Sequence, residues 1–119
     1  MNWIALGALY CTVAVLAGAF GAHGLKQRLA PDALAQWETA ARYLMYGGLG
    51  LLTMSLLAPR LETSVNGPAA SLAAGTLIFA GTVFGLALGS PRWFGAITPL
   101  GGLGMIAGFA WLAGLALRS

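Results

Sequence analysis

The chain has 119 residues, of which 59% are hydrophobic and only 8% are charged, and its formal net charge is +3. An ordinary soluble domain carries about 25% charged residues, so this composition excludes a soluble fold and indicates an integral membrane protein. The Lys and Arg residues are too scattered for a nucleic-acid surface, and Cys11, the single cysteine, allows no internal disulfide.

Four apolar runs are long enough to cross about 30 Å of hydrocarbon. Each is expected to be a helix, because a helix satisfies its own backbone polar groups inside the bilayer. The predicted fold is all-α: an integral membrane four-helix bundle that forms a single transmembrane domain over residues 1–119. The expected spans are about 3–22, 43–58, 69–89 and 95–117.

The first span ends in "GAFGAHGLKQR", residues 18–28, where His23, Lys26 and Arg28 follow a long run without charge. His23 has three interpretations: a neutral histidine satisfied at a helix end, a proton relay or ligand-binding group, and a metal or haem ligand. A metal site needs partners, and the chain has no second histidine. We therefore predict no metal and no cofactor.

An amphipathic segment is predicted between the first two spans. Pro31 and Asp32 suit the first turn of a helix. Glu38 and Arg42 form an i, i+4 pair in the favourable order. This segment either lies in the membrane interface or extends the second span into the cytoplasm, so that its helix begins near residue 32.

Eighteen glycines are present, many of them four residues apart. Small residues at this spacing let helix backbones touch in lipid. The contact is either inside one bundle or between copies in a homo-oligomer, and both can hold on different faces. The glycines predicted to pack helices are Gly18, Gly81, Gly85, Gly89, Gly104 and Gly108.

The stretch "GAITPLGGLG", residues 95–104, offers either a helix start at Thr98 and Pro99 or a kink at Pro99 inside the span. A helix start has free N–H groups that attract anions. Near basic connections, such a start predicts a lipid or anion site, the alternative being a capped helix without a ligand. The residues of the hypothetical site are His23, Lys26, Arg28, Arg92, Thr98 and Pro99.

Orientation follows from the basic residues. The 23–42 and 90–92 connections hold four of them, against Arg60 and Arg118 on the opposite side. The positive-inside rule then places both termini outside the cytoplasm, which is the periplasm if the membrane is a bacterial inner membrane.

Four segments, "GAFGAHGLK", "WETAARYLMY", "FAGTVFGLAL" and "RWFGAITPLGG", resemble the YgdD/YwdK-like family of small bacterial inner-membrane proteins. The resemblance covers nearly the whole chain. It implies four transmembrane helices and no established activity. The family commonly has a histidine after "YLMY", where this chain has Gly47, so a two-histidine site is not expected here.

The sequence has no nucleophile–base pair, metal spacing or phosphate loop, so an enzyme is not predicted. The acidic residues Asp32, Glu38 and Glu62 are expected in or beside connections, whereas coupled transporters carry an acidic residue at mid-membrane. We predict a protein that acts through helix packing, as a homo-oligomer or in a larger membrane complex, with lipids as partners. The alternative is an oligomeric transporter of small molecules or lipids.

Overall fold

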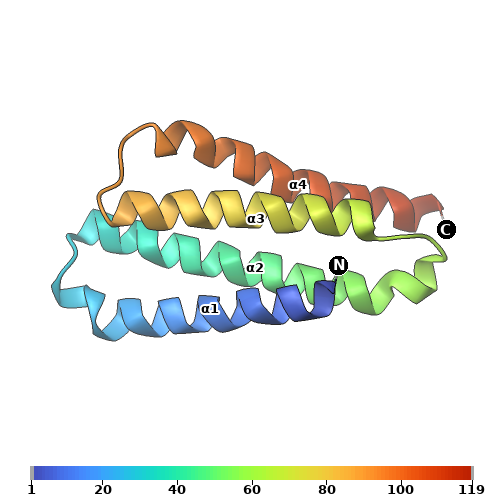
Figure 1. Ribbon diagram of the computed structural model, residues 1–119, viewed down its shortest axis with the longest axis horizontal. Helices are drawn as coiled ribbons and strands as arrows, with labels where there is room; N and C mark the ends of the chain where they lie inside the picture. Colours follow the sequence, from blue (N-terminus) through green and yellow to red (C-terminus); the bar gives the residue numbers. More distant parts are fainter. Residues whose placement is uncertain (1, 119) are drawn as a thin grey trace.

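The computed structural model describes residues 2–118, which form four long helices and one short 3₁₀ turn, with no strand in that range. Successive helices run antiparallel (Figure 1). All four are long and apolar enough to cross a membrane, which confirms the prediction of an all-α membrane protein. The elements are α1 (Trp3–His23), η1 (Leu25–Gln27), α2 (Pro31–Leu61), α3 (Asn66–Ala87) and α4 (Phe94–Arg118).

The amphipathic segment is the first part of α2 and not a separate helix. Pro31 occupies the first turn, where a missing N–H costs nothing, and Ala30 before it is extended. The helix continues for 31 residues, ending where Glu62 adopts a left-handed conformation with φ 53°. At about 1.5 Å per residue it is about 46 Å long, well beyond the hydrocarbon thickness.

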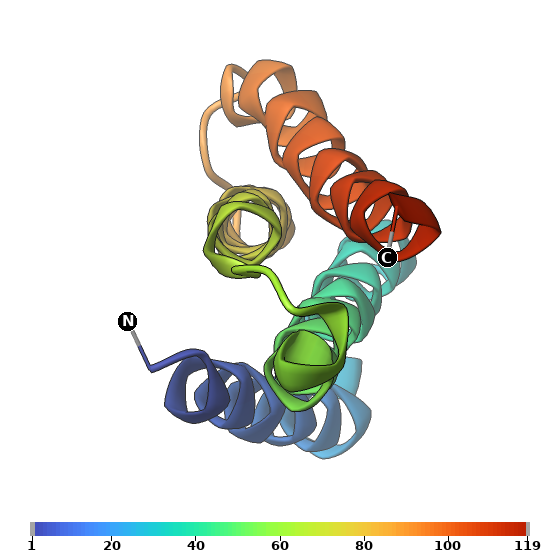
Figure 2. The same ribbon diagram turned by 90° about the vertical axis from the view of Figure 1, so that its right-hand side faces the viewer.

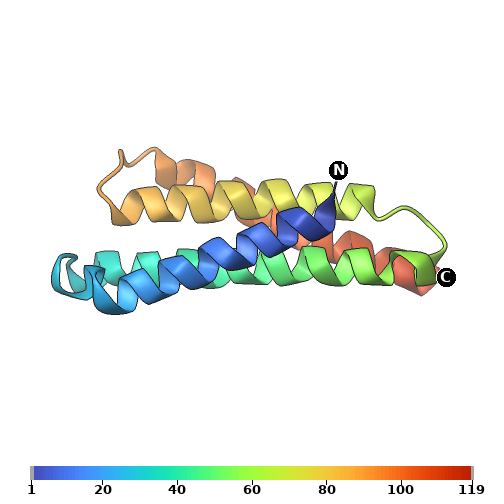
Figure 3. The ribbon, with the colours of Figure 1, turned by 60° about the horizontal axis from the view of Figure 1, so that its bottom comes forward.

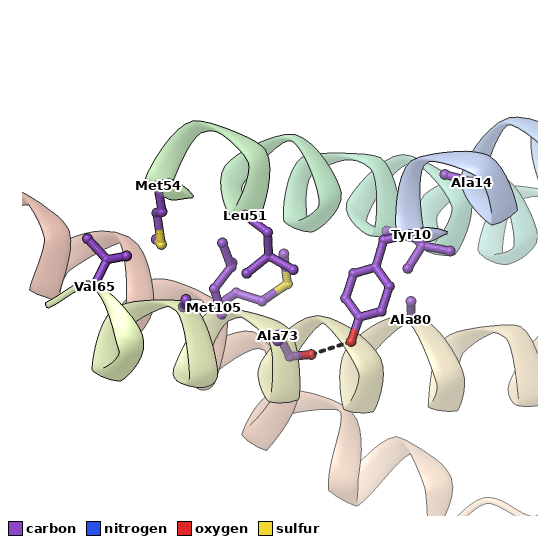
Figure 4. Close-up of a cluster of buried hydrophobic side chains, with 11 residues drawn as sticks. Tyr10, Ala14, Leu51, Met54, Val65, Ala73, Ala80 and Met105 are labelled. Carbon is purple, nitrogen blue, oxygen red and sulfur yellow. Dashed lines mark hydrogen bonds between the residues drawn. The ribbon is translucent and has the colours of Figure 1, made fainter. Parts of the chain in front are cut away.

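The helices form an open arrangement and not a closed square. Viewed from the end, α3 lies between α2 and α4, while α1 packs on α2 at the opposite edge from α4 (Figure 2). The N-terminal half of α1 crosses from α2 towards α3 (Figure 3). Two hydrogen bonds join α1 to α3. Trp3 Nε1 donates to Asn66 Oδ1 at 2.9 Å. The Tyr10 hydroxyl donates to the Ala73 carbonyl at 2.8 Å, as Figure 4 shows.

Side-chain size, more than polarity, decides which face of α1 is buried. Its buried residues recur at spacings of three and four and are mostly small: Gly7, Tyr10, Ala14, Ala17 and Gly21. Large apolar side chains face outward, as Leu16 does with 64% of its surface exposed. Hydrocarbon solvates large apolar groups as well as a protein core does, so close backbone packing decides which face turns inward.

The closest backbone approach is the seam between α3 and α4. A Cβ atom added at Gly75 would lie 2.6 Å from the carbonyl carbon of Gly104 and 2.7 Å from the carbonyl oxygen of Gly101. Between α1 and α2, a Cβ at Gly7 would lie 2.8 Å from the carbonyl oxygen of Gly48. Glycine is needed at these points because the neighbouring atoms are backbone and cannot move aside.

Candidate functional site

Glu38 and Arg42 occupy a groove between α1 and α2. The groove has a volume of about 300 Å³, and the small residues Ala14, Gly18 and Ala41 form much of its wall. Both charged side chains are exposed. Neither makes a hydrogen bond or an ion pair with any other residue of the range 2–118. The groove therefore presents one unpaired charge of each sign.

The level of the groove along the bundle follows from its position on α1. At about 1.5 Å per residue, Gly18 and Ala14 lie about 8 and 14 Å inside the His23 end of α1. α1 has 21 residues, about the length that crosses the hydrocarbon. α2 continues past Glu38 as a helix packed along α1, so Glu38 lies seven residues inside α2 and not in the connection itself.

Trp37 fixes the height of this part of α2 against α1. Its Nε1–H donates to the Ala17 carbonyl at 2.7 Å, and its ring covers Gly21, where a Cβ would lie 2.7 Å from the ring. The same ring meets the Phe84 ring of α3 edge-on, with the centroids 4.6 Å apart. One anchored side chain thus holds three helices together one residue away from Glu38.

The four basic residues of the hypothetical lipid site are exposed at one end of the bundle. His23 ends α1, Lys26 lies in η1, Arg28 follows it, and Arg92 lies in the turn before α4. The two connections that carry them share this end but lie at opposite edges of it (Figures 1 and 2). The fold thus places these charges on one membrane side without gathering them into one pocket.

A helix start at Thr98 and Pro99 is wrong, because α4 begins at Phe94 and contains Pro99. The Thr98 hydroxyl donates to the Phe94 carbonyl at 2.9 Å and lies 2.7 Å from the Thr82 hydroxyl of α3. Thr98 therefore joins two helices inside the bundle and does not cap one of them.

The N–H groups at the true start of α4 are already engaged. Those of Phe94, Gly95 and Ala96 donate to the carbonyls of Pro91, Arg92 and Trp93 at 3.1, 2.9 and 3.0 Å. The proposed source of directional bonds to an anion is thus absent at Pro99 and occupied at Phe94. The basic residues alone are left to attract anionic headgroups.

The predicted packing glycines divide into three groups. Gly104 and Gly108 lie against α3, where a Cβ would lie 2.9 Å from the Gly75 Cα and 2.8 Å from the Leu72 nitrogen. Gly85 meets side chains and not backbone: the ring of Phe94, the first residue of α4, lies 2.8 Å from the added Cβ, and the Ser90 hydroxyl lies 2.9 Å from it. A Cβ at each of the others would meet nothing within 4 Å: Gly18, Gly81 and Gly89.

Gly89 has a turn role, since its φ of 94° suits glycine best. Gly18 and Gly81 lie on surfaces of the bundle that no other part of the chain covers. The packing glycines predicted from the sequence did not include Gly75 or Gly7, although both meet another helix's backbone. Gly75 has no glycine four residues away, so the glycine spacing does not mark it. Among residues 2–118, no three His, Cys, Asp or Glu side chains gather as a metal site would require.

Comparison with known proteins agrees with the membrane architecture. The family described as "Protein of unknown function (DUF423)" matches residues 17–102. A UPF0382 membrane protein of Staphylococcus saprophyticus is 44% identical over 110 residues, covering 92% of both chains. One of Staphylococcus epidermidis is also 44% identical, covering 92% of this chain and 88% of its own, and one of Staphylococcus aureus is 39% identical, covering 92% and 90%. No solved structure matches the chain.

Proposed function

Because the chain belongs to the DUF423 family, a membrane protein family of unknown function, we propose a role from its structure: it is a non-enzymatic membrane protein that works by lateral association. It assembles with itself or enters a larger membrane complex as an accessory subunit. The groove at Glu38 and Arg42 carries this proposal, because two unpaired charges are exposed there. We infer that their level lies within the hydrocarbon.

The energetic reason is the cost of a charge in hydrocarbon. A charged side chain at the centre of a membrane helix costs about 2.5–3.5 kcal/mol on insertion scales, and such residues almost always face protein or water. Arg42 reduces the cost by extending its side chain towards the nearer surface. A second protein that covers the groove removes the rest of the cost of exposing these charges to hydrocarbon. Lateral association brings such a protein to the groove.

Association is tested by labelling the protein with a fluorophore and counting bleaching steps in lipid vesicles. The protein is diluted to a few copies per vesicle. We expect most spots to bleach in two or more steps, at a frequency above that of random co-occupancy. Single-step bleaching at the random level throughout would contradict self-association.

Transport is a second candidate, favoured by the carboxylate of Glu38 at membrane depth. A carboxylate placed there can carry a proton or bind a cation. Proteoliposomes with a pH-sensitive dye inside would be subjected to an external pH step. Transport predicts faster equilibration with the wild type than with Glu38→Gln or with empty vesicles. Equal rates in all three would exclude proton movement through this residue.

The proposed orientation places the basic end in the cytoplasm. Lys26, Arg28 and Arg92 lie there, whereas Arg60 and Arg118 belong to the opposite end. Arg42 is left out of this count because it lies 11 residues from the start of α2, whereas Arg60 and Arg118 lie in the last turns of their helices. A C-terminal reporter that is active only in the cytoplasm is expected to be silent, while the same reporter inserted after Arg28 is expected to be active. The reverse pattern would invert the topology.

A lipid role for the basic end is electrostatic in this proposal. Each basic side chain near an anionic leaflet contributes about 1 kcal/mol. Native mass spectra of the wild type, His23→Ala and Arg92→Ala, purified from the same membranes, are expected to show anionic lipid retained by the wild type and reduced in the Arg92 variant. Equal retention in all three would exclude a site at these residues.

A further inference from the structure

We infer that the α1–α2 groove is the contact surface between two copies of this chain, in which Glu38 of each copy pairs with Arg42 of the other. The inference rests on the proposed function, because it names the partner in the lateral association. The two copies are related by a two-fold axis along the membrane normal. Each copy supplies an oppositely charged partner for both charges of the other.

Symmetry makes this surface self-complementary. Two copies with the same orientation in a membrane place equal residues at equal depths, so a two-fold contact brings one patch onto itself. A patch of one charge sign would repel its copy. This groove holds one carboxylate and one guanidinium a single helical turn apart. Two symmetry-related Glu38–Arg42 ion pairs therefore form between the copies, and the net charge of the contact is zero.

The direction of the side chains favours pairing across the two copies. Side chains on a helix lean towards its N-terminus, so Arg42 leans towards the level of Glu38. Within the chain the two groups have the spacing of an ion pair, yet neither has a partner among residues 2–118. Both therefore remain available to a second molecule at the same depth.

The backbone around the groove allows a close approach. Ala14 and Gly18 on α1 and Ala41 on α2 present almost no side-chain bulk, although Met45 and Tyr46 of α2 also line the groove. A Cβ at Gly18 would meet nothing within 4 Å. Small residues of this kind let another helix come near. A lipid chain could fill the same volume, but it would leave both charges unneutralised in hydrocarbon. A second copy satisfies both shape and charge.

The test measures dimerisation in lipid vesicles by energy transfer between labelled copies, as the protein-to-lipid ratio is lowered. Glu38→Arg and Arg42→Glu are each expected to weaken the dimer by more than about tenfold, because like charges then face each other. The double variant, Glu38→Arg with Arg42→Glu, restores the opposite pairs and is expected to return within about threefold of the wild type. Single variants without effect, or a double variant as weak as the singles, would overturn the pairing.

A matched pair of glycine variants tests the surface without changing charge. Gly18→Leu and Gly81→Leu both add a side chain where the chain itself has open space. Only Gly18 lines the α1–α2 groove, while Gly81 lines an apolar groove beside α3. Gly18→Leu is expected to weaken the dimer by about tenfold or more and Gly81→Leu to leave it unchanged. The opposite result would move the contact to the α3 side and overturn the inference.

The outcomes separate the two proposals. A wild type that stays monomeric at every protein-to-lipid ratio would refute self-association and this interface together. A dimeric wild type that is insensitive to Gly18→Leu and to both charge variants would refute only this interface. Thermal unfolding in detergent shows whether a variant is folded. If a charge variant does not fold, Gly18→Leu still tests whether the groove is the contact surface.

Discussion

The α3–α4 seam and the α1–α2 groove are both built from small residues, but one is closed and the other open. In the seam, Gly75 and Gly104 approach so closely that an added Cβ would overlap backbone atoms of the facing helix. In the groove, a Cβ at Gly18 would meet nothing, and the charges of Glu38 and Arg42 stand beside it.

The difference shows that spacing identifies a surface able to pack but not its partner. Gly104 and Gly108 have the same spacing as Gly81 and Gly85, yet only the first pair meets another helix's backbone within the chain. What separates the open groove from an ordinary lipid-facing surface is charge, since hydrocarbon covers a small residue at no cost but not Glu38.

The largest effect is expected for Gly75→Ala, which attacks the closed seam. Its new methyl group would lie 2.5 Å from the Met105 nitrogen and 2.6 Å from the Gly104 carbonyl carbon, so α3 and α4 must move apart. We expect a loss of about 3 kcal/mol in the free energy of unfolding, at the upper end for overpacking. Unfolding in mixed detergent micelles measures this loss.

The control for the seam is Gly81→Ala on the same helix. Nothing lies within 4 Å of its added Cβ, so the change is expected to stay within about 0.5 kcal/mol. Equal losses for Gly75→Ala and Gly81→Ala would mean that the cost arises from the helix itself and not from the seam.

A smaller effect is expected for Gly85→Leu, a loss of about 1–2 kcal/mol. The added side chain meets the Phe94 ring and the Ser90 hydroxyl of its own hairpin and not a separate packing surface. Phe94→Ala should therefore relieve most of the loss in the double variant, which thermal unfolding measures. An unchanged loss in the Phe94→Ala background would indicate a different neighbour, such as a second copy.

The number and class of the helices follow from composition, because charge is so rare in this chain. Their partners do not follow in the same way. Gly75 has no glycine four residues away, and its role depends on where α4 places Gly101 and Gly104. A packing contact depends on the residues of both helices and on how they are aligned, so the sequence of one helix does not predict it.

The candidate site was missed for a related reason. Arg42 precedes the apolar run of the second span, which by itself indicates the edge of the membrane. Its depth depends on the register between α1 and α2, which the Trp37 bond to the Ala17 carbonyl fixes. Likewise, Thr98 before Pro99 suits a helix start, but the turn carbonyls before Phe94 begin α4 one turn earlier.

The smallest effect is expected for Thr76→Val, on the side of α3 that faces α2. Thr76 is fully buried, and its hydroxyl has no hydrogen-bond partner among residues 2–118. A Cβ added at Gly47 would collide with the Thr76 side chain, so shape alone brings the two helices together there. Valine keeps that shape and removes an unpaired polar group. The free energy of unfolding should stay unchanged or rise by up to about 1 kcal/mol.

Thr82→Val is the matched control, because the Thr82 hydroxyl lies 2.7 Å from the Thr98 hydroxyl of α4 and this bond joins two helices. Its loss is expected to cost about 0.6 kcal/mol, the average for such bonds in membranes. If Thr76→Val instead costs more than Thr82→Val in the same unfolding assay, the Thr76 hydroxyl has a partner such as a bound water. The contact between α2 and α3 would then depend on a polar bond as well as on shape. The difference between the packed helix contacts and the charged groove would be smaller.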